Sequence, residues 1–212
     1  MIKEVFQSKV INQLDSIVKE INKYLGEEYK NKIYEKAGKI NVFLARGKGV
    51  VKVGNEERYI EDEPICVKDD EYSYVVVPVD LLGQKAGNVM FLHVYLHALC
   101  SDIIENDCSG LNEVIIDYMA NDIAKLLENK NINITLDNNP SYESNSFYSN
   151  FYDMIEKFFL NNKKAIFEVL INDKENNISG ISEISNAIED SINNFIYNED
   201  SAIVEVKSKP KR

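Results

Sequence analysis

Hydrophobic residues in the first part of the chain recur at the spacing of one helical face. Residues three or four positions apart lie on the same side of a helix, and this spacing continues through the first 36 residues. The pattern predicts a helix over residues 2–36, with a break near Gly26 because glycine is a weak helix former. The apolar positions that define it are Val5, Phe6, Val10, Ile11, Leu14, Ile17, Val18 and Ile21.

From Ile40 onward the pattern changes to that of strands. Short runs of β-branched residues are separated by glycine and by clusters of charge, which predicts the strands of a small sheet. The runs cover residues 40–46, 49–53, 63–67 and 74–79. Pro78 has no N–H to donate to a neighbouring strand, so the last strand is expected to lie at a sheet edge or to end there.

Helical spacing returns after Gly87. Asn88 is the expected N-cap of an apolar helix that runs to about residue 104. The elements expected after it are a loop at 105–110 and helices at about 111–128, 143–160, 163–172 and 180–196.

This order of elements predicts an α+β fold in a single domain over residues 1–206. Residues 1–105 are expected to form a small mixed sheet lobe with an N-terminal helix and the apolar helix, and residues 106–206 a helical lobe. The basic end, residues 207–212, reads as a solvated tail. With 212 residues, of which 44% are hydrophobic and 28% charged, the chain can bury one substantial core.

Charge and cysteine content narrow the partners and the compartment. A formal net charge of -11 repels phosphate backbones, which argues against a nucleic-acid partner. No apolar run is long enough to span a membrane, and the first residues lack the apolar stretch of a signal peptide. We therefore expect a cytoplasmic protein without membrane contact. Its cysteines, Cys66, Cys100 and Cys108, cannot all pair with one another, in keeping with a reducing compartment.

The chain has only two histidines, His93 and His97, and both lie in the apolar helix. Their separation is about one helical turn, so both rings leave one face and can hold the same metal ion. The next predicted helix carries Glu113 and, one turn later, Asp117. A carboxylate from a second helix can complete a three-ligand zinc site, and a further carboxylate can hold the free ring nitrogen of a histidine ligand.

These residues resemble the motifs of the gluzincin metallopeptidases, of which thermolysin is the familiar member. HVYLH at residues 93–97 is similar to the family's HExxH, and the helix with Asn112, Glu113 and Asp117 is similar to its NExxSD-like segment, with Ile116 in place of the serine. The resemblance implies a zincin-like fold with zinc bound by His93, His97 and Glu113. It also implies supporting roles for Asn112 and Asp117.

Val94 stands where the family has the glutamate that acts as general base. Valine cannot take a proton from metal-bound water, so the resemblance implies a metal-binding protein without peptidase activity. The chain also lacks a third histidine to stabilise an oxyanion. Tyr142 is the candidate replacement, with Tyr148 and Tyr152 as weaker ones.

Three functions remain open from the sequence. The first is an inactive zincin relative that binds a peptide or protein segment in its cleft, or has a structural role; an edge strand at residues 73–79 is the expected docking strand. The second is an active metal-dependent hydrolase whose base is Glu105 or Glu143. The third is a metal-free protein in which the histidines and Glu113 form a buried polar network.

Cys100 offers an alternative third ligand because it lies three residues after His97. We rank it below Glu113, since three ligands from a single helix rarely surround an ion tetrahedrally. A buried thiol is the commoner fate of such a cysteine.

Overall fold

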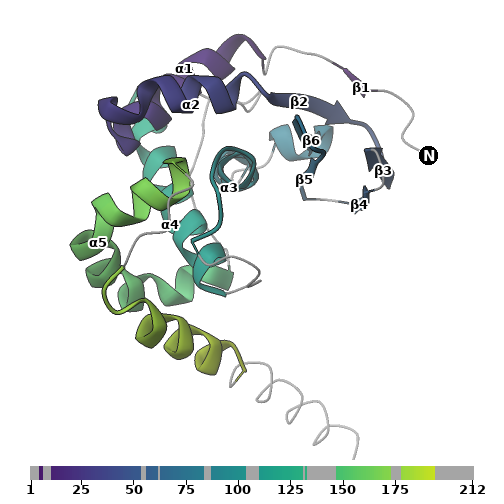
Figure 1. Ribbon diagram of the computed structural model, residues 1–212. Coiled ribbons are helices and arrows are strands. Elements are labelled where there is room, and N and C mark those ends of the chain that lie inside the picture. The colour runs from purple at the N-terminus through teal and green to yellow at the C-terminus, as the bar shows by residue number, and fades with distance from the viewer. Residues whose placement is uncertain are drawn as a thin grey trace, which may run out of the picture.

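Helix α3 (Gly87–Leu99) lies at the centre of the molecule, between a mixed sheet and a group of helices (Figure 1). The computed structural model describes residues 5–6, 11–53, 56–61, 63–83, 87–103, 110–130, 132, 147–172 and 178–193. The mixture of helices and small sheets confirms the α+β prediction. None of the described helices is long and apolar enough to cross a membrane.

Four strands form the main sheet in the order β1-β2-β6-β5. Strands β2 and β6 run parallel, with Ile40 opposite Ser73, and the other two pairings are antiparallel. Strand β6 carries Val75, Val76 and Val77 in succession, and all three are buried because both faces of this strand are covered. The bounds of the strands are β1 Val5–Phe6, β2 Ile40–Ala45, β5 Ile65–Lys68 and β6 Ser73–Pro78.

The prediction that residues 73–79 form an edge strand is wrong. Strand β6 is paired with β2 on one side and with β5 on the other, so the edge on that side of the sheet is β5. The other expectation, that the strand ends at Pro78, is confirmed, because Pro78 is the last residue of β6. A proline at that position removes a hydrogen-bond donor only where the ladder ends.

A separate two-stranded hairpin joins β3 (Gly49–Val53) to β4 (Glu56–Ile60). Strand β4 is not among the predicted strands, since four of the five residues of β4 are charged or tyrosine. Ile60 alone in this strand is buried, and it packs with Ala45 and Val76 in a small second core. Pairing with β3, the packing of Ile60 and contacts with β5 hold the strand in place.

The N-terminal helical region is divided as predicted at Gly26, whose φ of 127° lies in a region that L side chains rarely adopt. On either side lie α1 (Ile11–Leu25), and the short η1 (Glu27–Tyr29) followed by α2 (Lys30–Ala37). A helix from residue 2 is wrong at Val5 and Phe6, which form β1 against β2. This pairing is a contact with a distant segment, which local periodicity cannot report.

The remaining helices follow the predicted order with different bounds. Helix α3 begins at Gly87, which places Asn88 in its first turn, and it ends at Leu99 rather than at residue 104. The predicted break after residue 160 is wrong, because α5 is one continuous helix from Tyr152 to Asn172. Within it, Asn162 donates its side-chain N–H to the carbonyl of Phe158. The bounds are α4 Gly110–Glu128, η3 Phe147–Phe151, α5 Tyr152–Asn172 and a last helix at 181–193. Cys108 and the tail at 207–212 lie outside the described residues.

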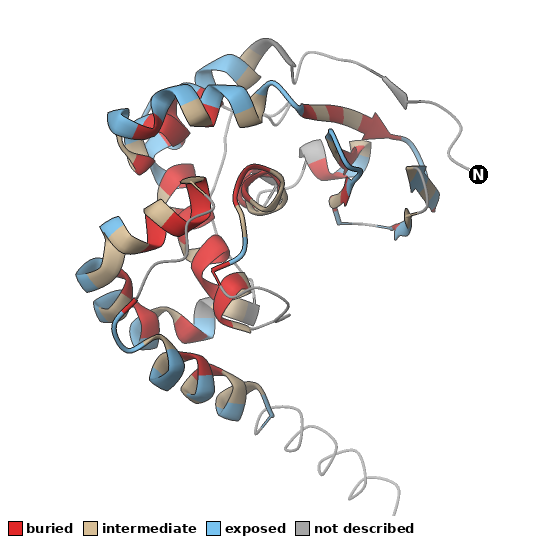
Figure 2. Ribbon diagram, in the orientation of Figure 1, coloured by how far each residue is buried: buried red, intermediate tan, exposed pale blue. Residues whose placement is uncertain are grey.

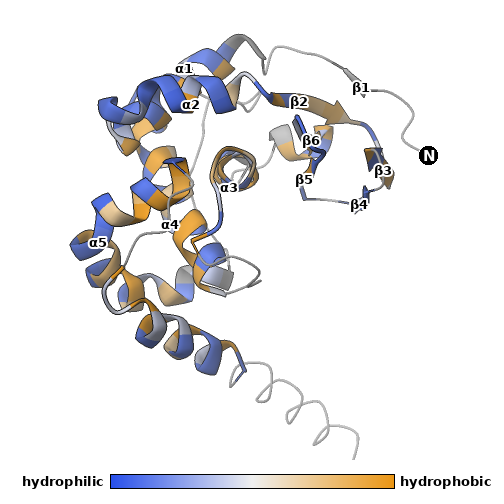
Figure 3. Ribbon diagram, viewed as in Figure 1, coloured by the Kyte–Doolittle hydropathy of each residue, from blue (hydrophilic) through white to orange (hydrophobic). Residues whose placement is uncertain are grey.

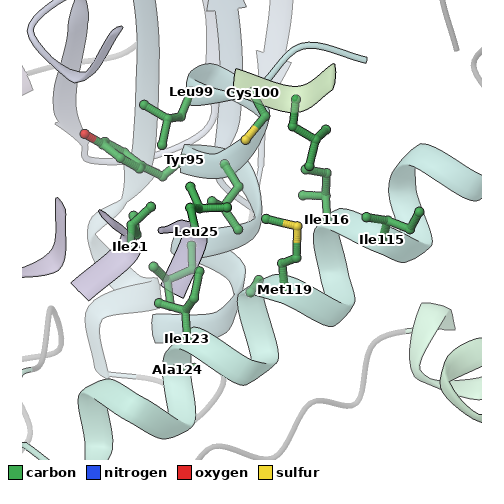
Figure 4. Packing of buried hydrophobic residues seen from close by; sticks show 14 of the residues in the cluster. Ile21, Leu25, Tyr95, Leu99, Cys100, Ile115, Ile116, Met119, Ile123 and Ala124 are labelled. Atoms are coloured by element: carbon green, nitrogen blue, oxygen red, sulfur yellow. The ribbon is translucent and has the colours of Figure 1, made fainter. Parts of the chain in front are cut away.

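One large hydrophobic core holds these elements around α3. It extends from Ile17 in α1 to Ile188 in the last helix, so both predicted halves of the chain contribute to it. Buried residues concentrate on α3, α4 and the sheet strands, and α3 is apolar around nearly its whole circumference (Figures 2 and 3). Figure 4 shows Tyr95 and Leu99 of α3 among residues of α1 and α4. Close packing on most sides leaves such a helix little room to rotate or shift, and this fixes the direction of His93 and His97.

Candidate metal centre

The two histidines occupy the part of α3 that the core leaves partly open. Leu92, Tyr95 and Leu96 are at most 1% exposed, whereas the side chains of His93 and His97 are 17% and 24% exposed. The helical spacing brings both imidazoles to the same side, with ring centroids 4.7 Å apart. Packing of the intervening residues therefore determines where the rings point.

Glu113 reaches both rings from the first turn of α4. Its Oε2 atom lies 3.2 Å from His93 Nε2 and 3.3 Å from His97 Nε2, and the two nitrogens are 3.1 Å apart. In the described part of the chain, these are the three side chains of metal-binding type whose ligand atoms converge. The structure thus brings together the three residues that the sequence analysis selected.

This triangle has the size of one face of a tetrahedral metal site. Zinc binds nitrogen and oxygen ligands at about 2.0–2.2 Å, so two ligands of a tetrahedral ion are about 3.3–3.4 Å apart. The three distances of 3.1–3.3 Å match that value closely. Two neutral imidazoles and one carboxylate are also ligands that suit zinc. The residues present therefore fit a three-ligand site with a fourth position left for another group.

Asp117 holds the opposite side of the His93 ring. Its Oδ1 atom lies 3.2 Å from His93 Nδ1, and its side chain is only 4% exposed. When Nδ1–H donates to this carboxylate, Nε2 presents a lone pair toward Glu113 and His97. This is the tautomer that a metal ligand requires.

The electrostatics of the triangle favour a positive charge among its three side chains. Burial acts most strongly on the His93 ring and lowers its pKa, but hydrogen bonds with Asp117 and Glu113 outweigh it and raise the pKa to about 9. Hydrogen bonds with His93 and His97 hold the pKa of Glu113 well below its ordinary value. Two lone pairs and a carboxylate at this distance repel each other unless a proton or a metal ion lies among them.

Two residues behind Asp117 complete its environment. Tyr152 donates its hydroxyl to Asp117 Oδ2, and Asn121 donates its side-chain N–H to the hydroxyl oxygen of Tyr152. Asn121 also donates to the backbone carbonyl of Asp117, at 2.9 Å. The sequence analysis considered Tyr152 only as an oxyanion donor and did not select Asn121. Asn121 lies one helical turn after Asp117, and this spacing is the sequence feature that could have identified it.

Tyr148 lies directly beside the centre. Its ring stacks on that of His93, with centroids 6.1 Å apart and planes at 10°. Burial and the charges of Glu113, Asp117 and Glu63 raise the pKa of Tyr148, which keeps its hydroxyl protonated. Tyr142, the preferred candidate from sequence, lies outside the described residues, as do Glu105 and Glu143.

The other selected residues have different surroundings. Asn112 is buried and accepts the backbone N–H of Ile103 at 2.8 Å, which ties the segment after α3 to the start of α4. Val94 is partly buried and packs against the large core. Cys100 is buried within the same core (Figure 4) and is not part of the convergent triangle.

Comparisons of this chain with family models, curated proteins and solved structures found no match.

Proposed function

We propose that this protein binds one zinc ion through His93, His97 and Glu113 and is a zincin-like metallopeptidase relative without peptidase activity. The observation that supports the metal site is the triangle of ligand atoms 3.1–3.3 Å apart, contributed by two helices. Asp117 adds the carboxylate partner that zinc-binding histidines usually have.

The proposed lack of peptidase activity follows from the residues Val94 and Tyr148. A bound zinc ion would polarise a carbonyl group and lower the pKa of a water molecule. Hydrolysis also requires a group that moves the proton from that water to the leaving amine. Val94 cannot do so, while Tyr148 can only donate a hydrogen bond from its protonated hydroxyl. The retained functions are therefore metal binding and the binding of an extended peptide or protein segment.

Strand β5 is the docking strand that we propose for such a segment. It is the edge of the main sheet on the side away from β2, and it contacts α3. An extended segment can pair with an edge strand through main-chain hydrogen bonds. This assignment replaces the strand at residues 73–79, which lies inside the sheet.

Metal analysis of the purified protein tests the proposal. After exposure to zinc and removal of free ions, we expect about one zinc ion per chain, released by a chelator, because the site offers three ligands with the required spacing. Glu113→Ala should lower zinc affinity by a large factor because it removes a direct ligand. Cys100→Ala is the matched control and should leave the affinity unchanged, since its thiol lies in the core.

Two results would contradict the proposal. Absence of stoichiometric zinc in the wild-type protein would favour the metal-free polar network. A larger loss of affinity from Cys100→Ala than from Glu113→Ala would replace the two-helix site by a site with a sulfur ligand.

A further inference from the structure

A chain of hydrogen bonds continues from the proposed metal centre through α4 to the start of α5. It runs from His93 to Asp117 and then to Tyr152 and Asn121. We propose that Tyr152 is a positioning residue of the metal centre, which acts through Asp117 and sets how firmly His93 is held for metal binding. This inference rests on the proposed zinc site.

Asp117 has little access to water. Its side chain is 4% exposed, and a buried carboxylate must be satisfied by protein groups on both oxygens. His93 takes Oδ1 and Tyr152 takes Oδ2. Without the tyrosine hydroxyl, Oδ2 would lose a charge-assisted hydrogen bond, and the carboxylate would be free to turn away from His93.

The hydrogen bonds that join Asn121, Tyr152 and Asp117 have a defined direction. Asn121 donates to the oxygen of the Tyr152 hydroxyl, so the hydroxyl proton is available for Asp117. Asp117 then accepts from both sides, which requires that His93 carries its proton on Nδ1. The hydrogen bonds thereby keep a proton on Nδ1 and leave Nε2 as the atom that faces His97 and Glu113 and that a metal ion would bind.

The ring of Tyr152 is itself held in place by its neighbours. Tyr152 is the first residue of α5, and its ring meets that of Tyr118 edge-on, with centroids 5.3 Å apart and planes at 88°. Helix α4 lies between α3 and α5 and contacts both (Figure 1). Residues of α3, α4 and α5 thus meet at the Asp117 carboxylate. Through this carboxylate Tyr152 can affect the position of the His93 ring without touching it.

Zinc affinity of a Tyr152→Phe variant tests the inference, measured in competition with a chromophoric chelator. Direct partners of metal ligands are typically worth roughly 10- to 100-fold in affinity, and we expect a smaller loss of about 3- to 10-fold for this more distant group. Tyr118→Phe is the matched control, because it removes a hydroxyl from the neighbouring ring and should leave the affinity unchanged. The d–d absorption of the Co²⁺-substituted protein should shift in Tyr152→Phe alone, since the His93 ring is less constrained.

A second pair of measurements separates positioning from folding. In an Asp117→Ala background, Tyr152→Phe should cause no further loss of zinc affinity, because the path to His93 is already broken. Asn121→Ala is a second variant and should lower affinity in the same direction. Urea unfolding of the metal-free proteins reports any general loss of stability, which would accompany a merely structural role.

The outcomes distinguish this inference from the proposed function. Wild-type protein that binds no zinc overturns both. Normal zinc binding with unchanged affinity in Tyr152→Phe overturns the positioning role alone. Equal losses in Tyr118→Phe and Tyr152→Phe, or a further loss in the Asp117→Ala background, also overturn it.

Discussion

His93 and Val94 are adjacent on α3 and have opposite effects on the chemistry of the centre. His93 is held by Asp117 on one nitrogen and faces Glu113 and His97 with the other. Val94 packs against the core and offers no group that can exchange a proton. Because they are consecutive residues, the two side chains leave α3 about 100° apart. At this scale the described residues supply the ligands of the proposed metal site, and Val94 offers it no group that could take a proton from metal-bound water.

Substitution of Val94 tests whether the missing general base accounts for the proposed lack of peptidase activity. We expect no turnover of unstructured peptides by the wild-type protein, and zinc-dependent hydrolysis by Val94→Glu, because a general base typically contributes roughly 10²- to 10⁴-fold to rate. A fluorogenic casein assay with added zinc measures both. Val94→Gln is the control, since it has the size of glutamate without its basicity. Zinc-dependent hydrolysis by the wild-type protein would support the active hydrolase instead.

At the scale of elements, the packing of α3 against α4 brings the residues of the proposed metal centre together. The two helices pack along each other, and the buried Asn112 ties the start of α4 to the segment after α3. This arrangement brings the first turn of α4 to the histidines. Helix α1 also contacts α4 through the core, and α1 ends at Leu25, directly before Gly26.

Gly26→Ala should destabilise the protein. Its φ of 127° is unfavourable for any residue with a Cβ atom, and we expect a loss of about 1–2 kcal/mol in the free energy of unfolding. Urea denaturation of the metal-free protein measures it. Gly38→Ala is the matched control, because Gly38 has a φ of -65° and an added Cβ would meet only backbone oxygens at 3.4–3.5 Å. Equal effects of the two substitutions would show that the conformation of Gly26 is not the cause.

At the scale of the whole molecule, the proposed metal site lies between two helices, α3 and α4, that belong to the same hydrophobic core. Ligands from α3 and α4 are held by a core that extends from Ile17 to Ile188. A metal ion held by ligands from two helices would bind the folded chain in preference to the unfolded chain, and this coupling would stabilise the fold. Zinc at 100 times its dissociation constant would add about 2.7 kcal/mol to the free energy of unfolding.

This stabilisation should depend on pH in a defined direction. In the metal-free protein the pKa of His93 is raised from 6.5 to about 9, so the stability that its proton contributes is complete below pH 6.5 and is lost as the pH rises to about 9. Zinc competes with that proton and binds more tightly over the same range. The difference in Tm between zinc-loaded and metal-free protein should therefore widen from pH 6.5 to 9. Thermal unfolding measures it, and a constant difference would argue against His93 as a ligand.

Local sequence by itself determined several parts of this structure. The spacing of His93 and His97 placed two rings on one helical face, and the β-branched runs at residues 40–45 and 73–78 formed strands. Gly26 divided the first helices, and Glu113 and Asp117 lay one turn apart on α4. These features depend on backbone propensity and on the helical period, which act over a few residues.

Contacts between distant segments decided the rest. Val5 and Phe6 became a strand because β2 offered them an edge, and β6 became an interior strand because β5 returned beside it. Strand β4 formed from a charged segment because β3 supplied its hydrogen bonds. Tyr152 reached Asp117 rather than the open side of the centre because α5 packs on α4. Pairing partners and helix packing are properties of the folded chain, since each depends on residues far away in the sequence.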